Sequence, residues 1–107
     1  MKPNNIFSLL GLAMRAGKVV SGEFSTEKAI KTGKAFLVIV AEDASANTKK
    51  SFTDSCTYYQ VPLRIYGTKE ELGHHIGKQM RASLAVTDEG FGRELARKID
   101  MQNNMEV

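Results

Sequence analysis

The sequence predicts an α/β protein: a three-layer α/β/α sandwich around a mixed sheet of about four strands. Helix-type and strand-type patterns alternate along all 107 residues. Residues 35–41 form a continuous, partly β-branched apolar run, which is typical of a strand covered on both faces. The length is that of one domain, and no linker, repeat or low-complexity segment divides the chain. We therefore expect residues 1–107 to fold as a single unit.

The first third of the chain predicts a helix, a short strand and a second helix. Apolar residues recur at helical spacing from Ile6 to Ala13, and Gly17 is suited to end that helix. Residues 18–21 are expected to form a short strand before Gly22. The second helix covers about residues 23–32. Its inward face holds Thr26, Ala29 and Ile30, and its other face carries Phe24, Glu27, Lys28 and Lys31.

A third helix follows the buried apolar run. Asp43 or Ser45 is available to cap it at its start. Its apolar stripe consists of Thr48, Phe52, Cys56 and Tyr59. Residues 61–66 then predict the third main strand.

The last third predicts two further helices with a strand between them. Thr68 and Glu71 have the spacing of a capping box that opens a short helix, and this helix should fade by Gly77. Residues 83–86 are the fourth strand. A closing helix is marked by Phe91, Leu95 and Ile99. After it, residues 102–107 are expected to fray.

Composition narrows the class of protein. Apolar residues make up 42% of the chain and charged residues 25%, which is the balance of a soluble globular domain. No stretch is apolar enough for a membrane span, and the N-terminus lacks the pattern of a signal peptide. The single cysteine, Cys56, excludes an intramolecular disulfide and a cysteine metal cluster and suits a reducing cytosol. We therefore expect a cytoplasmic protein with no membrane partner.

The positive charge is concentrated at one end of the sequence. The chain has 15 Lys and Arg against 12 Asp and Glu, a net charge of +3. Residues 1–34 hold six basic and two acidic side chains, so the whole excess lies in the first third. This distribution suggests a polyanionic partner, nucleic acid above all, although an ordinary solvated surface also explains a charge of this size.

Candidate catalytic residues do not form a constellation in the sequence. His74 and His75 are adjacent, so on a helix they diverge by about 100° and do not share one metal ion. Cys56 falls on an apolar stripe, and Glu42 follows a strand where a capping role is enough to explain it. We expect no catalytic residue, no bound metal and no cofactor. Convergence of Glu42, His74 or Cys56 in one cleft would revive an enzyme hypothesis.

The start of the second helix has the features of an RNA-binding site. Gly22 precedes a first turn whose free backbone N–H groups and positive dipole end suit a phosphate. Lys28 and Lys31 extend positive charge along the helix, although a solvated face is their default interpretation. An exposed Phe24 could stack on an unpaired base, or could instead tuck under the helix start as a hydrophobic staple.

Residues 22–33 resemble the signature of the kink-turn RNA-binding ribosomal proteins, which include the archaeal large-subunit protein seven-Ae and the eukaryotic protein thirty-e. The family pattern is a glycine, any residue, Asn-Glu, two residues, a lysine, a small residue and a closing glycine. Residues 81–86 resemble the family's Ala-Ala-Ser-Val-Ala-Ile loop and strand, and residues 7–18 are similar to the bacterial YlxQ-type branch. The resemblance covers roughly residues 5–98.

The resemblance implies a non-catalytic protein that binds structured, kink-turn-like RNA, in the ribosome or beside ribosomal or RNA-processing proteins. It implies a close backbone approach at Gly22, a phosphate or base contact from Lys28, and apolar contacts to a flipped-out nucleotide from the loop before the fourth strand. The residues expected to contact RNA are Gly22, Glu23, Phe24, Ser25, Lys28, Lys31, Arg81, Ala82, Ser83 and Leu84.

The chain departs from the family pattern at one pair of residues. Phe24 and Ser25 stand where the family has Asn-Glu, and the family's glutamate reads guanine edges in sheared G·A pairs. Serine is too short to make that contact in the same way, so stacking by Phe24 would have to replace part of the polar recognition. A protein-interaction adaptor that has lost specific RNA binding is the alternative function.

Overall fold

The computed structural model of the chain describes residues 5–105, which form five helices and a four-stranded sheet. The elements in chain order are α1 (Asn5–Arg15), β1 (Val19–Ser21), α2 (Glu23–Lys31), β2 (Leu37–Val40), α3 (Ala46–Tyr59), β3 (Leu63–Ile65), α4 (Lys69–His75), β4 (Ser83–Val86) and α5 (Glu89–Met105). Every predicted helix and strand is present, in the predicted order.

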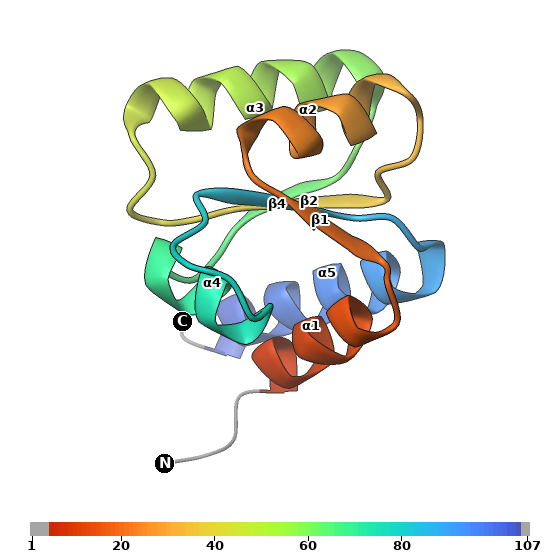
Figure 1. Cartoon of the computed structure of the whole chain (residues 1–107), viewed down its shortest axis with the longest axis vertical. Coiled ribbons are helices and arrows are strands. Elements are labelled where there is room, and N and C mark those ends of the chain that lie inside the picture. Colours follow the sequence, from red (N-terminus) through yellow and green to blue (C-terminus); the bar gives the residue numbers. More distant parts are fainter. Residues whose placement is uncertain (1–4, 106–107) are drawn as a thin grey trace.

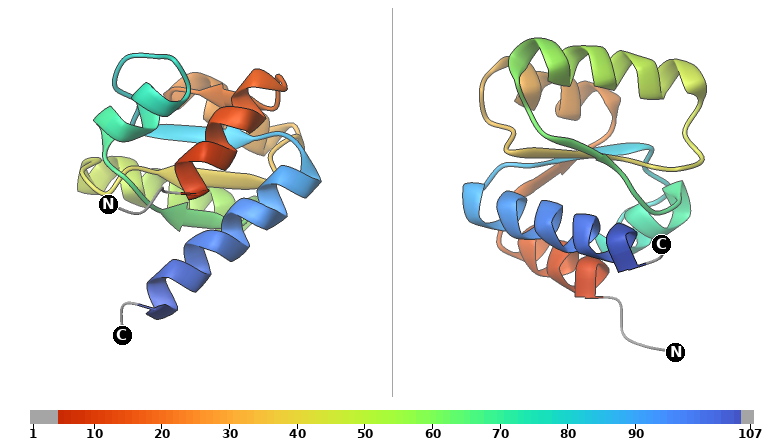
Figure 2. Two further views of the ribbon diagram at one scale, coloured as in Figure 1. Left: turned by 90° about the horizontal axis from the view of Figure 1, so that it is seen from below. Right: turned by 180° about the vertical axis from the view of Figure 1, so that it is seen from behind.

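The sheet has the strand order β1-β4-β2-β3 and is mixed. β2 and β3 are parallel, whereas β4 runs antiparallel to both of its neighbours. Helices α2 and α3 cover one face, and α1, α4 and α5 cover the other (Figures 1 and 2). This confirms the three-layer sandwich and the mixed four-stranded sheet.

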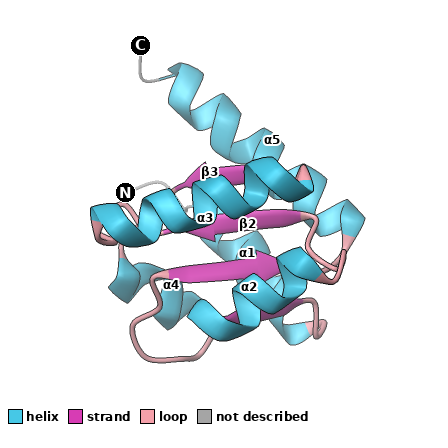
Figure 3. Cartoon of the chain, turned by 90° about the horizontal axis from the view of Figure 1, so that it is seen from above, coloured by secondary structure: helices cyan, strands magenta, loops and turns pink. Residues whose placement is uncertain are grey.

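The two inner strands form the centre of the core. All four residues of β2 and all four of β4 are buried, because each strand has a neighbour on both sides and helices above and below. This explains why residues 37–40 lack the alternation of a half-exposed strand. Figure 3 shows α2 and α3 lying over the sheet. On that face, the buried hydroxyls of Thr26 and Ser83 lie 3.4 Å apart and satisfy each other by a hydrogen bond.

Local chemistry at the helix ends accounts for the boundaries. The Ser45 side chain accepts a hydrogen bond from the backbone N–H of Thr48, so Ser45 is the cap of α3. Asp43 instead accepts from the backbone N–H of Lys69 at 2.8 Å and ties the turn after β2 to the start of α4. The predicted capping box at the start of α4 is present, with Thr68 as its N-cap residue.

Two expectations were wrong, one about the burial of a side chain on α3 and one about the end of α5. Tyr59 is 42% exposed although it continues the helical stripe, because it lies in the last turn of α3 at one end of the sheet and borders an open hollow there. The closing helix does not fray at residue 102: α5 continues to Met105, and residues 106–107 lie outside the described part. The Tyr66 hydroxyl lies 3.3 Å from the Gln102 amide oxygen and donates a hydrogen bond to it, which ties this last stretch to β3's end.

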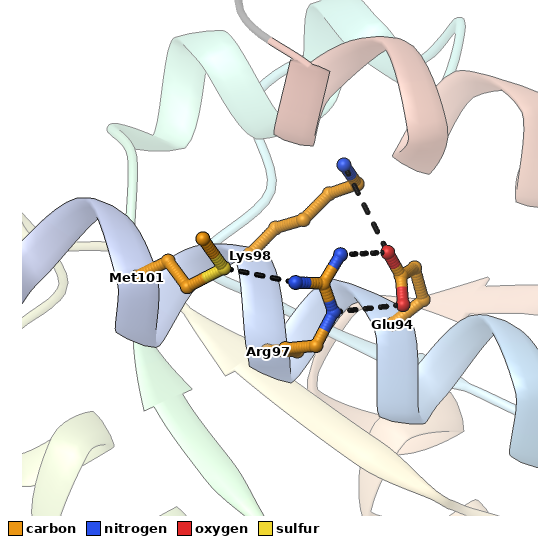
Figure 4. Close-up of polar contacts among 4 residues, drawn as sticks. All are labelled: Glu94, Arg97, Lys98 and Met101. Carbon is orange, nitrogen blue, oxygen red and sulfur yellow. Dashed lines mark hydrogen bonds and ion pairs between the residues drawn. The ribbon is translucent and has the colours of Figure 1, made fainter.

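A polar network on α5 spans residues 94–101 (Figure 4). The Arg97 guanidinium contacts both carboxylate oxygens of Glu94 and lies 2.9 Å from the sulfur of Met101, one turn further on. Lys98 adds a weaker contact to Glu94 at 3.8 Å. Side-chain pairs at i, i+3 and i, i+4 stabilise a helix locally. This network therefore stabilises the part of α5 that leads up to residue 102.

Candidate nucleic-acid interface

Two segments that are far apart in the sequence meet at one end of the sheet. Antiparallel pairing of β1 with β4 sets Ser21 opposite Leu84. The backbone N–H of Gly22 donates to the carbonyl of Ser83 at 3.0 Å. The Arg81 guanidinium donates to the Ser21 hydroxyl at 3.1 Å, across 60 residues of sequence. The start of α2 and the loop before β4 therefore form one surface, which we call the α2–β4 surface: residues 21–28 and 80–82.

Gly22 gives this surface its backbone geometry. Its φ of 93° and ψ of 162° belong to a region that glycine adopts far more readily than other residues. A Cβ at this position would meet nothing within 4 Å, so conformation rather than space requires glycine. Because the N-cap has no side chain, no side-chain cap satisfies the first N–H groups of α2, which suits them to an anion. Glu23 is exposed in the same first turn and brings a carboxylate to the helix start.

Phe24 lies on the outside of α2. It is 78% exposed, so the hydrophobic-staple interpretation is wrong. Its ring borders a groove of about 290 Å³ between α2 and the edge strand β1, which we call the α2/β1 groove. The residues that line it are Val20, Phe24, Ser25, Lys28, Ala29, Thr32, Lys34 and Thr87.

The two lysines of α2 lie in different surroundings. Lys31 is in the last turn and lies 3.8 Å from the Glu27 carboxylate, which also accepts a hydrogen bond from Ser55. Lys28 belongs to none of the ion pairs among the described residues, and it borders the α2/β1 groove with Phe24. An unpaired ammonium group is the more available of the two for a phosphate.

The loop before β4 differs from the expectation at two of its four residues. Ser83 is 1% exposed and Leu84 is 0% exposed, because both belong to an inner strand. Their assignment as RNA contacts was therefore wrong for their side chains. Arg81 and Ala82 are half-buried and border the surface. The exposed apolar side chain of this loop is Met80, which no periodic pattern singled out.

Arg81 is held in place from within the protein. Besides the Ser21 hydroxyl, its guanidinium donates to the carbonyl of Met80 at 3.0 Å. The backbone N–H of Arg81 donates to the carbonyl of Lys69, which anchors the loop to α4. A guanidinium has five N–H donors, so these contacts leave further donors for a phosphate.

The candidate catalytic side chains do not converge. Glu42 accepts a hydrogen bond from the Gly67 backbone at 3.2 Å, and His75 stacks on Phe7 with ring centroids 4.4 Å apart. Cys56 is buried on α3, across the sheet from α4 and its histidines (Figure 1). Burial, with a smaller effect from the Glu27 carboxylate, raises the pKa of the Cys56 thiol to about 11. Within residues 5–105, no group of three His, Cys, Asp or Glu side chains is placed to hold a metal ion.

The fold is that of a ribosomal-protein-like α/β/α domain. Residues 4–96 match the model of the Ribosomal protein L7Ae/L30e/S12e/Gadd45 family, and the chain belongs to this family. It is 50% identical to the RNA-binding protein YlxQ of Bacillus subtilis over 94 residues, which cover 88% of this chain and 94% of that protein.

A more distant relative and a solved structure also match most of the chain. The chain is 36% identical to the large ribosomal subunit protein eL30 of Tetrahymena thermophila over 89 residues, covering 81% of this chain and 86% of that protein. A solved structure of a Bacillus halodurans protein of unknown function superposes with a TM-score of 0.89 at 43% identity, covering 92% of this chain and 99% of that one. No helix in the described part of the chain is long and apolar enough to cross a membrane.

Proposed function

We propose that this protein binds structured RNA through the α2–β4 surface, without catalysis, in the cytoplasm and in association with the ribosome or another ribonucleoprotein. The observation that carries the proposal is the hydrogen-bonded junction of the two segments at Gly22 and Ser83. It sets the first N–H groups of α2 near the Arg81 guanidinium, which contacts Ser21, and Lys28 lies further along the same helix. Membership of a family with RNA-binding and ribosomal members supports the same function.

The RNA class we propose is a sharply bent, kink-turn-like motif. A straight duplex offers phosphates but no unpaired base, whereas a bent motif can bring two phosphate strands and an unstacked base to one surface. Phe24 and Met80 are the exposed apolar side chains suited to cover such a base. Ser25 is half-buried at the groove, where its hydroxyl can make a short polar contact.

A gel-shift series tests the specific part of the proposal. We expect a kink-turn RNA to bind more tightly than a straight duplex of equal length at the same salt concentration. Because phosphate contacts supply most of the affinity, binding of the kink-turn RNA should weaken steeply as salt is raised. Equal affinity for the two RNAs would remove the claim of a bent motif. Copurification with a protein that survives ribonuclease treatment, without RNA binding, would instead favour a protein-interaction adaptor.

Lys28→Ala tests the assignment of the surface. We expect this change to weaken binding of the kink-turn RNA about tenfold, the equivalent of ~1.4 kcal/mol, and to reduce the salt slope by about one. Lys50→Ala is the matched control, because Lys50 is exposed on α3 and pairs with Asp54 at 3.1 Å. A Lys28→Ala protein with the affinity and salt slope of the Lys50→Ala protein would contradict the assignment.

A further inference from the structure

We propose that the α2/β1 groove binds an unpaired RNA strand that continues from the structured RNA held at the start of α2. This inference rests on the proposed function and adds the single-stranded flank as a second part of the ligand. The groove combines the two features that such a strand requires, an aromatic face for a base and unpaired positive charge for the backbone.

The aromatic face belongs to Phe24 at the mouth of the groove. The ring is 78% exposed, and Val20 on the edge strand β1 is a second exposed apolar side chain of the lining. Phe24 and Val20 line the same groove, so they form an exposed apolar patch, and such patches mark binding surfaces. Stacking on it requires an unpaired base, because both faces of a base inside a duplex are already covered.

The charge of the groove is complementary to a polyanion. Lys28 and Lys34 both line it, and none of the described residues that line it is acidic. Neither lysine takes part in an ion pair among the described residues, unlike Lys31 on the α3 side of the same helix. The groove therefore offers two ammonium groups to phosphates, with no carboxylate among its described lining residues.

The direction of the groove links it to the proposed RNA surface. It begins beside Phe24, two residues from Gly22, and reaches Thr32 at the other end of α2. A helix of nine residues is about 13 Å long, enough for about four stacked nucleotides at 3.4 Å each. Thr32 also borders a second hollow, of about 770 Å³, where Phe36 and Tyr59 are partly exposed. The path thus has aromatic rings at both ends and lysines between them.

The test compares a blunt-ended kink-turn RNA with the same RNA carrying four unpaired uridines at its 5′ or its 3′ end. Affinities are measured by fluorescence anisotropy at fixed salt for the native protein, Lys34→Glu and Lys50→Glu. Lys34 lies outside the α2–β4 surface, and the two variants have the same net charge. We expect the extension at one of the two ends to improve the affinity of the native protein about fivefold to tenfold. Lys34→Glu should lose this gain and still bind the blunt RNA as well as Lys50→Glu does.

The possible outcomes separate the two proposals. If the blunt RNA binds but neither extension adds affinity, or if the gain survives Lys34→Glu, the groove does not hold the flank and the further inference is wrong. If the blunt kink-turn RNA binds no better than a straight duplex, the proposed function itself fails. Poly-glutamate that displaces the extended RNA as well as oligouridine does would assign the groove to acidic peptides and overturn the inference. Photocrosslinks from 4-thiouridine in the extension should map to residues 24–34.

Discussion

Replacing Gly73 by alanine is expected to destabilise the protein, although alanine is the better helix former. A Cβ on Gly73 in α4 would lie 1.8 Å from the carbonyl oxygen of Gln79 and 3.1 Å from the Cα of Met80. Both neighbours are backbone atoms, so no side-chain rotation relieves the clash. Because non-bonded heavy atoms settle near 3.5–4.0 Å, α4 and the following loop have to separate by about 1.5 Å or more.

The size of this destabilisation follows from three effects, of which the first opposes the other two. Helix propensity favours Gly73→Ala by roughly 0.5–1 kcal/mol. Overpacking of this kind costs typically about 1–3 kcal/mol. The separation also stretches two hydrogen bonds that close the loop, from the N–H of Lys78 to the carbonyl of Gly73 at 2.8 Å and from the N–H of Arg81 to that of Lys69 at 3.0 Å. With about 1 kcal/mol for each of these bonds, and the middle of the range for each of the other two effects, the net loss is about 3 kcal/mol.

Thermal and urea unfolding followed by circular dichroism measure this loss. A change of about 3 kcal/mol lowers the midpoint of a domain of this size by roughly 12–18 °C. Gly90→Ala in α5 is the control, because its Cβ would meet only the Asp88 carboxylate, at 3.3 Å, and a shift of a few tenths of an ångström relieves this contact while keeping the bond from the Phe91 N–H. It should stay within about 0.5 kcal/mol of the native protein. A Gly73→Ala midpoint at or above the native one would refute the reasoning. Since Arg81 ends the same loop, the variant should also bind the kink-turn RNA less tightly.

Three further predictions concern capping and titration. Thr68→Ala should lower the free energy of unfolding by about 1 kcal/mol in urea titrations, because it removes the cap of α4; an unchanged midpoint would contradict this. Cys56, with its thiol pKa raised to about 11, should react with a thiol reagent at pH 8 only on unfolding, and labelling of the native state at the rate of a free thiol would contradict its burial. The pKa of His75 lies below its ordinary value of 6.5, chiefly through burial and secondarily through His74, with Glu71 acting in the opposite direction. The folded state therefore binds this proton more weakly than the unfolded chain, so the stability that neutral His75 provides is present above pH 6.5 and is lost as the pH falls through the folded pKa. An NMR titration should place the pKa of His75 below 6.5, and His74→Gln should raise it; a pKa at or above 6.5 would show that the packing on Phe7 does not exclude water.

Element types were predictable because they depend on neighbours in the sequence. The helical period, the capping box at Thr68 and the continuous apolar run of β2 involve residues within one or two turns or one strand. Element ends were less predictable where distant residues contribute. The last turn of α5 is tied down by a bond from Tyr66, which lies 36 residues earlier in the chain.

The candidate site was likewise predictable where it depends on local sequence, and not where it depends on the arrangement of the sheet. The glycine and the aromatic residue at the start of α2, and the lysine further along it, follow from local helix geometry, and the sequence also identified the loop before β4. Which residues of that loop reach the surface depends on the position of β4 inside the sheet. From the sequence, Leu84 is a plausible apolar contact for RNA. In the structure its side chain is buried in the core, because β4 is an inner strand of the sheet.

The sequence by itself determined the order of helices and strands, the excess of positive charge in the first third and the candidate RNA residues, because these depend on composition and short-range spacing. Only the tertiary structure decided that Gly22 and Arg81 share a surface, that Phe24 is exposed and that a groove follows α2. The physical reason is that hydrogen bonds between β1 and β4 join residues about 60 positions apart. Their partners are selected by the burial of the whole sheet, which no local pattern encodes.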